Sequence, residues 1–156
     1  IFTAIRIAKE FGVKLTIEHC TDGALIVDDL AKEGFPVAVG PSFGHASKYE
    51  LRNKSFETPG ILDKAGCRVS IITDAPVIPQ QYLALCAGLA VKSGMDEFAA
   101  LQAITINPAR HLMIEKRVGS IEAGKDADIV ISDGNIMNSE SCLKYTIIDG
   151  KVVYHV

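Results

Sequence analysis

Apolar residues in the first two thirds of the chain switch repeatedly between helical and strand spacing. Residues 2–11 keep helical spacing and are followed by Gly12, a natural helix end, so we expect a helix there. Residues 13–19 alternate apolar and polar positions, as a half-buried strand does. The succession continues with helices expected at about 22–32, 58–65, 81–92 and 96–104, and strands at 36–39 and 68–73. Such alternation is typical of a parallel α/β sheet.

The spacing changes beyond about residue 116. Strand character without intervening helices is found at 118–121, 127–131 and 145–148. Asp149-Gly150, between two apolar segments, is a strong signal for a two-residue hairpin turn. We therefore expect an α/β unit at 1–116 and a small all-β unit at 117–156.

Composition and charge argue against some classes of function. The 156 residues include 16 Lys and Arg against 19 Asp and Glu, and the net charge of −3 gives no electrostatic reason to bind nucleic acid or an anionic membrane. No apolar run reaches the roughly 18 residues of a membrane helix. The four cysteines lie far apart without a CxxC pair, which predicts reduced, buried thiols in a cytoplasmic protein: Cys20, Cys67, Cys86 and Cys142.

Two polar residues sit at the ends of expected strands. His19 ends the segment 13–19, and Asp74 directly follows 68–73. In parallel α/β folds, the carboxyl ends of the strands face the ligand crevice. An imidazole and a carboxylate there can bind a divalent metal, and Asp74 can take a proton from water that the metal acidifies. The alternative is a hydrogen-bonded strand-end histidine and a turn aspartate, and this short motif leaves both open.

The strand at 36–39 should separate these two residues. We therefore expect His19 and Asp74 at the same sheet edge, about two strand spacings or roughly 10 Å apart, with converging side chains.

Three segments in a fixed order carry a family resemblance. They are 71–76 (Ile-Ile-Thr-Asp-Ala-Pro), 101–110 with its Thr-Ile-Asn-Pro-Ala run, and 118–130 with its Gly-Ser-Ile and Gly-Lys-Asp-Ala-Asp turns. The segments around Ile17-Glu-His-Cys20 and 2–11 fit the same family. Over essentially its whole length, the chain resembles the C-terminal part of the amidohydrolase superfamily, in its imidazolonepropionase-like branch.

The resemblance implies a (β/α)8 TIM-type barrel, with a metal site at its strand ends, beside a β-sandwich built from both ends of the chain. It places His19 at the sixth strand's metal-binding histidine. It places Asp74 at the eighth strand's aspartate, a metal ligand and general base. Gly40-Pro41-Ser42 would end the seventh strand. The segment after it would cover the barrel mouth, where four residues are expected to contact substrate: His45, Ser47, Lys48 and Asn53. The alternative for His45 is an ordinary loop residue.

Some of the family's site residues have no counterpart in these 156 residues. The strand-one His-x-His, the strand-four lysine or carboxylate and the strand-five histidine are absent. The helix at 2–11 would follow that fifth strand, and three strands cannot close an eight-stranded barrel. We expect the missing N-terminal part of the barrel, or a second copy of the chain, to cover the open edges. Without that cover, the side chains of Leu15, Ile17 and Val37 or Val39 are expected to be exposed.

These observations lead to a functional hypothesis. The chain is expected to be the C-terminal portion of a metal-dependent amidohydrolase that cleaves a non-peptide carbon–nitrogen bond, in an amide or cyclic amide of small size, with metal-activated water. Zinc is the first candidate for the metal, with manganese, iron and nickel as alternatives. The competing hypothesis is a catalytically silent fragment or binding module that keeps the scaffold. The isolated chain should be inactive, because two ligands cannot complete a catalytic site.

Overall fold

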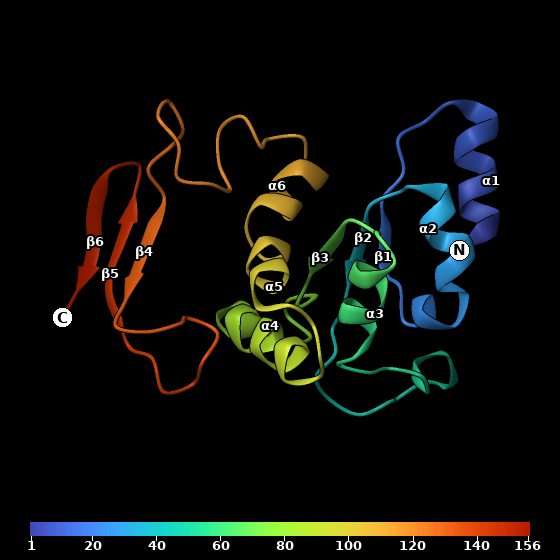
Figure 1. The fold of residues 1–156 in the computed structure, drawn as a ribbon, viewed down its shortest axis with the longest axis horizontal. Helices are drawn as coiled ribbons and strands as arrows, with labels where there is room; N and C mark the ends of the chain where they lie inside the picture. Colours follow the sequence, from blue (N-terminus) through green and yellow to red (C-terminus); the bar gives the residue numbers. More distant parts are fainter.

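The computed structural model describes residues 1–156 and contains two separate three-stranded sheets (Figure 1). The helices are α1 (Phe2–Phe11), α2 (Val27–Glu33), α3 (Thr58–Lys64), α4 (Leu83–Lys92), α5 (Glu97–Ala103) and α6 (Ile106–His111). The strands are β1 (Ile17–His19), β2 (Val37–Val39), β3 (Val69–Ile71), β4 (Ile129–Ser132), β5 (Leu143–Ile148) and β6 (Lys151–His155). Three short 3-10 helices complete the elements: η1 (Gly23–Ile26), η2 (Tyr49–Leu51) and η3 (Gln80–Tyr82).

The first sheet is parallel, and the expected mixed α/β fold is confirmed. Its order is β1-β2-β3, with Val37 opposite both Ile17 and Val69. Every residue of β2 and β3 is buried. Strands without polar alternation are typical of a parallel sheet that is covered on both faces.

The helices α1 to α5 all contribute buried side chains to the core that covers this sheet. Their most buried side chains, including Leu30 and Leu62, belong to the same core as the strands. The expectation that the strand side chains lose their cover is wrong. Ile17, Val37 and Val39 are only 6%, 0% and 2% exposed. Leu15 is partly buried against the same core.

Local signals predicted the helix ends and the hairpin correctly. Gly12 ends α1 with a left-handed φ of 64°. The Asp96 carboxylate caps α5 by accepting a hydrogen bond from the Ala99 N–H at 2.8 Å. Asp149 and Gly150 have φ values of 49° and 73°, and both positive angles fit the tight turn that joins β5 to β6.

Two expected strands differ from the structure. The segment 13–19 forms a strand only at its end, as β1, and 118–121 forms none. No strand pairs with 118–121, and Ile121 is 83% exposed. The chain instead forms a loop that is closed by the ion pair between Arg117 and Asp126.

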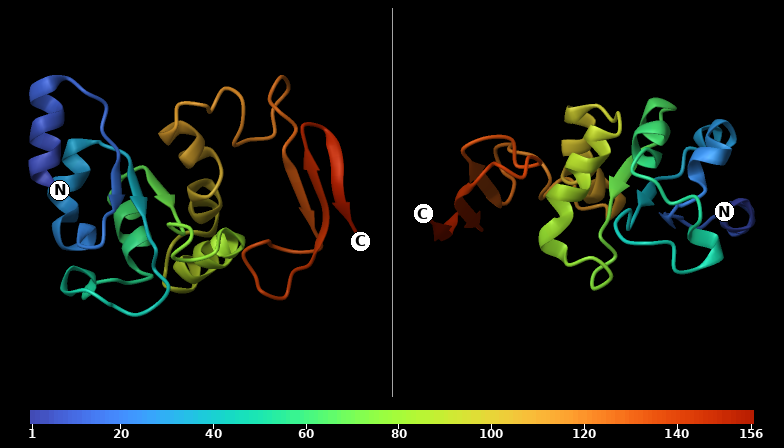
Figure 2. Two further views of the ribbon diagram at one scale, coloured as in Figure 1. Left: turned by 180° about the vertical axis from the view of Figure 1, so that it is seen from behind. Right: turned by 90° about the horizontal axis from the view of Figure 1, so that it is seen from below.

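The second sheet, β4-β5-β6, is antiparallel and lies at the far end of the molecule from α1 (Figures 1 and 2). The helices α4–α6 lie between the two sheets. A turn before β5 attaches the second sheet to the helices. Met137 is buried in the main core, and the side-chain amide of Asn135 donates a hydrogen bond to the Glu97 carboxylate.

The cysteines are free thiols, and most are buried. Cys20, Cys67 and Cys86 are buried as expected, whereas Cys142 is exposed, which corrects that prediction. None of the helices has both the length and the hydropathy needed to cross a bilayer.

Replacing Gly88 with alanine should test the join between α4 and the Met137 turn. Alanine normally stabilises a helix interior by about 1 kcal/mol relative to glycine. Here the added Cβ would collide with the Met137 carbonyl oxygen, so we expect a net loss of about 1–3 kcal/mol in the free energy of unfolding. Denaturant titration measures the change, and a stabilised Gly88→Ala protein would contradict the close packing.

Candidate functional site

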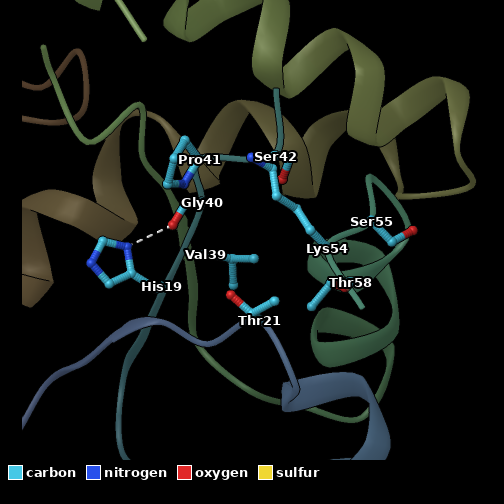
Figure 3. Close-up of a pocket in the computed structure, with 9 residues that line it drawn as sticks. All are labelled: His19, Thr21, Val39, Gly40, Pro41, Ser42, Lys54, Ser55 and Thr58. Atoms are coloured by element: carbon cyan, nitrogen blue, oxygen red, sulfur yellow. Dashed lines mark hydrogen bonds between the residues drawn. The ribbon is translucent and has the colours of Figure 1, made fainter. Parts of the chain in front are cut away.

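His19 is held by the end of the neighbouring strand. Its Nδ1 lies 2.9 Å from the carbonyl oxygen of Gly40, and the Gly40 N–H donates in return to the His19 carbonyl at 3.3 Å (Figure 3). A carbonyl oxygen can only accept a hydrogen bond, so Nδ1 carries the hydrogen of the neutral ring. Nε2 therefore keeps its lone pair. This is the arrangement in which a histidine serves as a metal ligand, with a carbonyl fixing its orientation.

Asp74 lies beyond the end of β3, at the same edge of the sheet. The parallel order β1-β2-β3 shows that one strand separates it from His19, and that His19 ends β1 whereas Asp74 follows the carboxyl end of β3. Its side chain is exposed and forms no ion pair within residues 1–156. The backbone turn after it is closed by the hydrogen bond from the Val77 N–H to the Asp74 carbonyl at 2.8 Å. Convergence of the two side chains stays a prediction.

Both candidate ligands lie on strained backbone. His19 has a φ of 64° and Asp74 a φ of 52°, in the left-handed region that favours glycine. Such a conformation costs an L-residue about 1–2 kcal/mol and persists only where surrounding contacts enforce it. Strain of this kind clusters at functional sites, so its presence at both strand ends is independent support for a site here.

Gly40 allows the three strand ends to meet. Its φ is 144°, and a Cβ at this position would collide with the carbonyl oxygen of Ile72, just beyond β3. Only glycine permits this approach. The same residue supplies the carbonyl that holds His19, so one backbone position links the ends of β1, β2 and β3.

A small polar pocket opens beside His19 (Figure 3). It is lined by His19, Thr21, Val39, Gly40, Pro41, Ser42, Lys54, Ser55 and Thr58. Four of these residues carry hydroxyl groups and none carries a carboxylate. Asp74 is outside this lining.

The residues that the sequence predicted as substrate contacts lie elsewhere. His45, Ser47 and Lys48 are exposed on the loop between β2 and α3 and do not line the pocket. The Asn53 side-chain amide donates to Asp22 Oδ1 at 2.8 Å, which fastens the loop to the segment after β1. Their contact with substrate stays a prediction.

Sequence reasoning missed the pocket residues Lys54 and Ser55. They lie in an irregular loop, where no periodicity shows which side chains point inward. Ser42 was the only residue here with a local signal in the sequence. It directly follows Gly40 and Pro41, at the end of the expected strand at 36–39.

The neighbouring thiol of Cys20 is buried. Burial, with a smaller contribution from the nearby Cys67, raises the pKa of Cys20 to about 11, so this thiol is neutral at pH 7 when no metal is bound. Within residues 1–156, no three His, Cys, Asp or Glu side chains come together around one ion position. The imidazole and carboxylate of His19 and Asp74 fit two positions of a divalent metal with nitrogen and oxygen ligands.

Comparisons with known proteins show which family the chain belongs to. Residues 1–153 match the amidohydrolase family. The crystal structure of an amidohydrolase from Thermotoga maritima MSB8 is 41% identical with a TM-score of 0.93, over 99% of this chain and 40% of that chain.

Two curated relatives extend the comparison. The imidazolonepropionase of Thermoplasma volcanium is 36% identical over 105 residues, which are 66% of this chain and 26% of the relative. The 5-methylthioadenosine/S-adenosylhomocysteine deaminase of Thermoanaerobacter pseudethanolicus is 30% identical over 133 residues, covering 79% of this chain and 30% of the relative. The chain thus spans less than half the length of these proteins. The resemblance found in the sequence is confirmed, and the chain belongs to the amidohydrolase family.

Proposed function

We propose that residues 1–156 are the C-terminal portion of a metal-dependent hydrolase that cleaves a non-peptide carbon–nitrogen bond, in an amide or cyclic amide of small size. The observation that carries the proposal is the His19 ring, whose Nδ1 is bound to Gly40 and whose Nε2 is free, at the same sheet edge as Asp74. Family membership and relatives named as an imidazolonepropionase and a deaminase support this reaction class.

The two residues have different parts in this mechanism. A divalent metal held by His19 and Asp74, with zinc as first candidate, would supply water of lowered pKa and polarise the substrate carbonyl. The Gly40 carbonyl fixes the orientation of the His19 ring, so that Nε2 would be available to hold the metal. Asp74 has a free carboxylate that can accept the water's proton. It then donates this proton to the leaving nitrogen, acting first as general base and then as general acid.

The proposed scaffold is the last part of a (β/α)8 barrel. β1, β2 and β3 would be its sixth to eighth strands, and residues 117–156 would belong to a β-sandwich shared with the rest of the chain. The boundary near residue 116 falls in the irregular segment between α6 and β4. In support, β1 and β3 each have one unpaired edge within this sheet.

Surface area supports the same scaffold. The chain exposes 9627 Å², whereas a compact monomer of this size exposes roughly 7,600 Å². The excess of about 2,000 Å² is in the range that specific interfaces bury. Part of it is an apolar groove between the helices and the second sheet, lined by side chains that include Leu101, Ile104, Leu112 and Ile129.

The competing function is a catalytically silent scaffold or binding module. It is favoured by the observation that only two candidate ligands lie at the sheet edge within these residues. Experiments on the complete protein can distinguish the two hypotheses, because a hydrolase needs its remaining metal ligands from outside residues 1–156.

Substitution of the two ligands in the complete protein tests the hydrolase. Both residues have left-handed φ values, which asparagine tolerates better than most residues, so His19→Asn and Asp74→Asn should preserve the fold. We expect Asp74→Asn to lower kcat at least about a hundredfold on an amide or cyclic amide substrate, since the proton acceptor is lost. His19→Asn should lower the bound metal measured by elemental mass spectrometry.

A matched control is His155→Asn, which changes an exposed histidine of β6. It should leave both activity and metal content unchanged. Full activity in Asp74→Asn, or full metal content in His19→Asn, would overturn the assignment of that residue.

The scaffold proposal predicts the behaviour of residues 1–156 on their own. Unpaired strand edges and exposed apolar side chains, such as Ile121, should make this piece self-associate or bind an exposed-hydrophobe dye. Analytical ultracentrifugation and dye fluorescence measure both properties. A monodisperse monomer that melts cooperatively and binds no dye would contradict the proposal.

A further inference from the structure

The turn that begins at His19 is strained at two successive residues. His19 and Cys20 have φ values of 64° and 47°, both in the left-handed region that favours glycine. Backbone of this kind persists only where surrounding contacts enforce it. The Gly40 N–H holds the His19 carbonyl at the start of the turn. Residues 20–23, which complete the turn, therefore need support of their own.

Packing against α3 supplies part of this support. A Cβ at Gly23 would collide with the sulfur of Cys20 and press against the side chain of Leu62 in α3. Cys20 and Leu62 are both buried in the main core. The turn is therefore fixed on the side that faces this helix.

A hydrogen bond from the loop between β2 and α3 supplies the rest. Asn53 Nδ2 donates to Asp22 Oδ1 at 2.8 Å, across 31 positions of the sequence. Asp22 occupies the N-cap position of η1, where an aspartate commonly accepts N–H groups of its own helix, but its side chain makes no cap bond. It forms no ion pair within residues 1–156 either. The Asp22 carboxylate is thus committed to Asn53.

The loop that carries Asn53 is itself anchored beside His19. Phe43 and Phe56 pack edge to face at its base, with ring centroids 5.6 Å apart. Thr21, the residue before Asp22, lines the same small pocket as His19 (Figure 3). A donor on an anchored loop can hold a strained turn, because much of the entropy cost of ordering that donor is already met by the fold.

We propose that Asn53 is a positioning residue that holds the His19 imidazole in its metal-binding orientation, acting through Asp22 and the strained turn between Asp22 and His19. The inference rests on the proposed function, which gives His19 the part of a metal ligand. Release of Asp22 lets the His19 backbone relax toward ordinary φ values, which moves Nδ1 away from the Gly40 carbonyl. The binding orientation is then only partly populated, and the apparent metal affinity falls in proportion.

Exchange of the amide for a carboxylate tests this role in the complete protein. Asn53→Asp keeps the size of the side chain, but it removes the donor and places two carboxylates against each other. We expect the dissociation constant for zinc, measured by competition with a chromophoric chelator, to rise at least about tenfold, since a hydrogen bond to a charged group contributes that much or more to an equilibrium constant. Asn138→Asp, the same charge change at an exposed asparagine, should have no effect.

A swap of the two side chains provides the rescue. Asp22→Asn combined with Asn53→Asp restores the pair with donor and acceptor reversed, so most of the zinc affinity should return. Asp22→Asn alone keeps only a neutral hydrogen bond and should give an intermediate loss. This variant and the swap carry the test if Asn53→Asp does not fold.

The metal-free complete protein gives a second readout. Nitrogen NMR of labelled histidine, assigned with His19→Asn, reports which ring nitrogen of His19 carries the hydrogen. We expect the Nδ1–H form in the unsubstituted protein and in the swap, and its loss in Asn53→Asp. This signal needs neither bound metal nor hydrolysis, so failure of the proposed reaction is distinguishable from failure of the Asn53 role.

Three outcomes would overturn the proposal. The first is a zinc affinity that does not change in Asn53→Asp, including the case in which only KM rises, as expected if Asn53 contacts substrate instead. The second is a loss of affinity that the swap does not recover. The third is a loss of affinity with the Nδ1–H form of His19 intact, which would identify Asn53 as a purely structural residue of the loop.

Discussion

The paired hydrogen bonds between His19 and Gly40 decide the geometry of this edge of the molecule. Gly40 reaches its position because it lacks a Cβ that would strike the Ile72 carbonyl, and its own carbonyl then orients the imidazole. The strained backbone of His19 is retained because the return bond from the Gly40 N–H holds it. Three short strands, of three residues each, are thereby aligned without a long ladder.

Features set by neighbouring residues were predictable from the sequence, and those set by distant ones were not. Gly12, the Asp96 cap and the Asp149-Gly150 turn act within a few residues, so their signals are visible in the chain itself. The burial of Ile17 depends on helices that pack from elsewhere, and the expected strand at 118–121 lacked a partner to pair with. Periodicity records which residues can be buried, not what covers them.

The same distinction between local and distant interactions applies to the candidate site. His19 and Asp74 were found because a polar residue directly after an apolar strand has a defined place in a parallel sheet. The place of Lys54 in the pocket could not be predicted, because it depends on the hydrogen bond from Asn53 to Asp22 and on the packing of Phe56 against Phe43. Neither contact can be predicted from the local spacing of apolar and polar residues. Under the proposed function, the residues for chemistry come from strand ends, and an anchored loop lines the pocket beside them.

The closed base of that loop has a consequence for how the protein can change. The contact between Phe43 and Phe56 closes the base of the loop. Residues 44–50, which follow Phe43 and form the tip of the loop, are all exposed. Exposed loop tips tolerate insertions and exchanges that buried backbone does not. Mutations can therefore accumulate at this tip, or be introduced there by design, without disturbing the pocket floor. The loop separates a freely variable outer surface from a fixed inner one, which makes it a natural place for related enzymes to diverge.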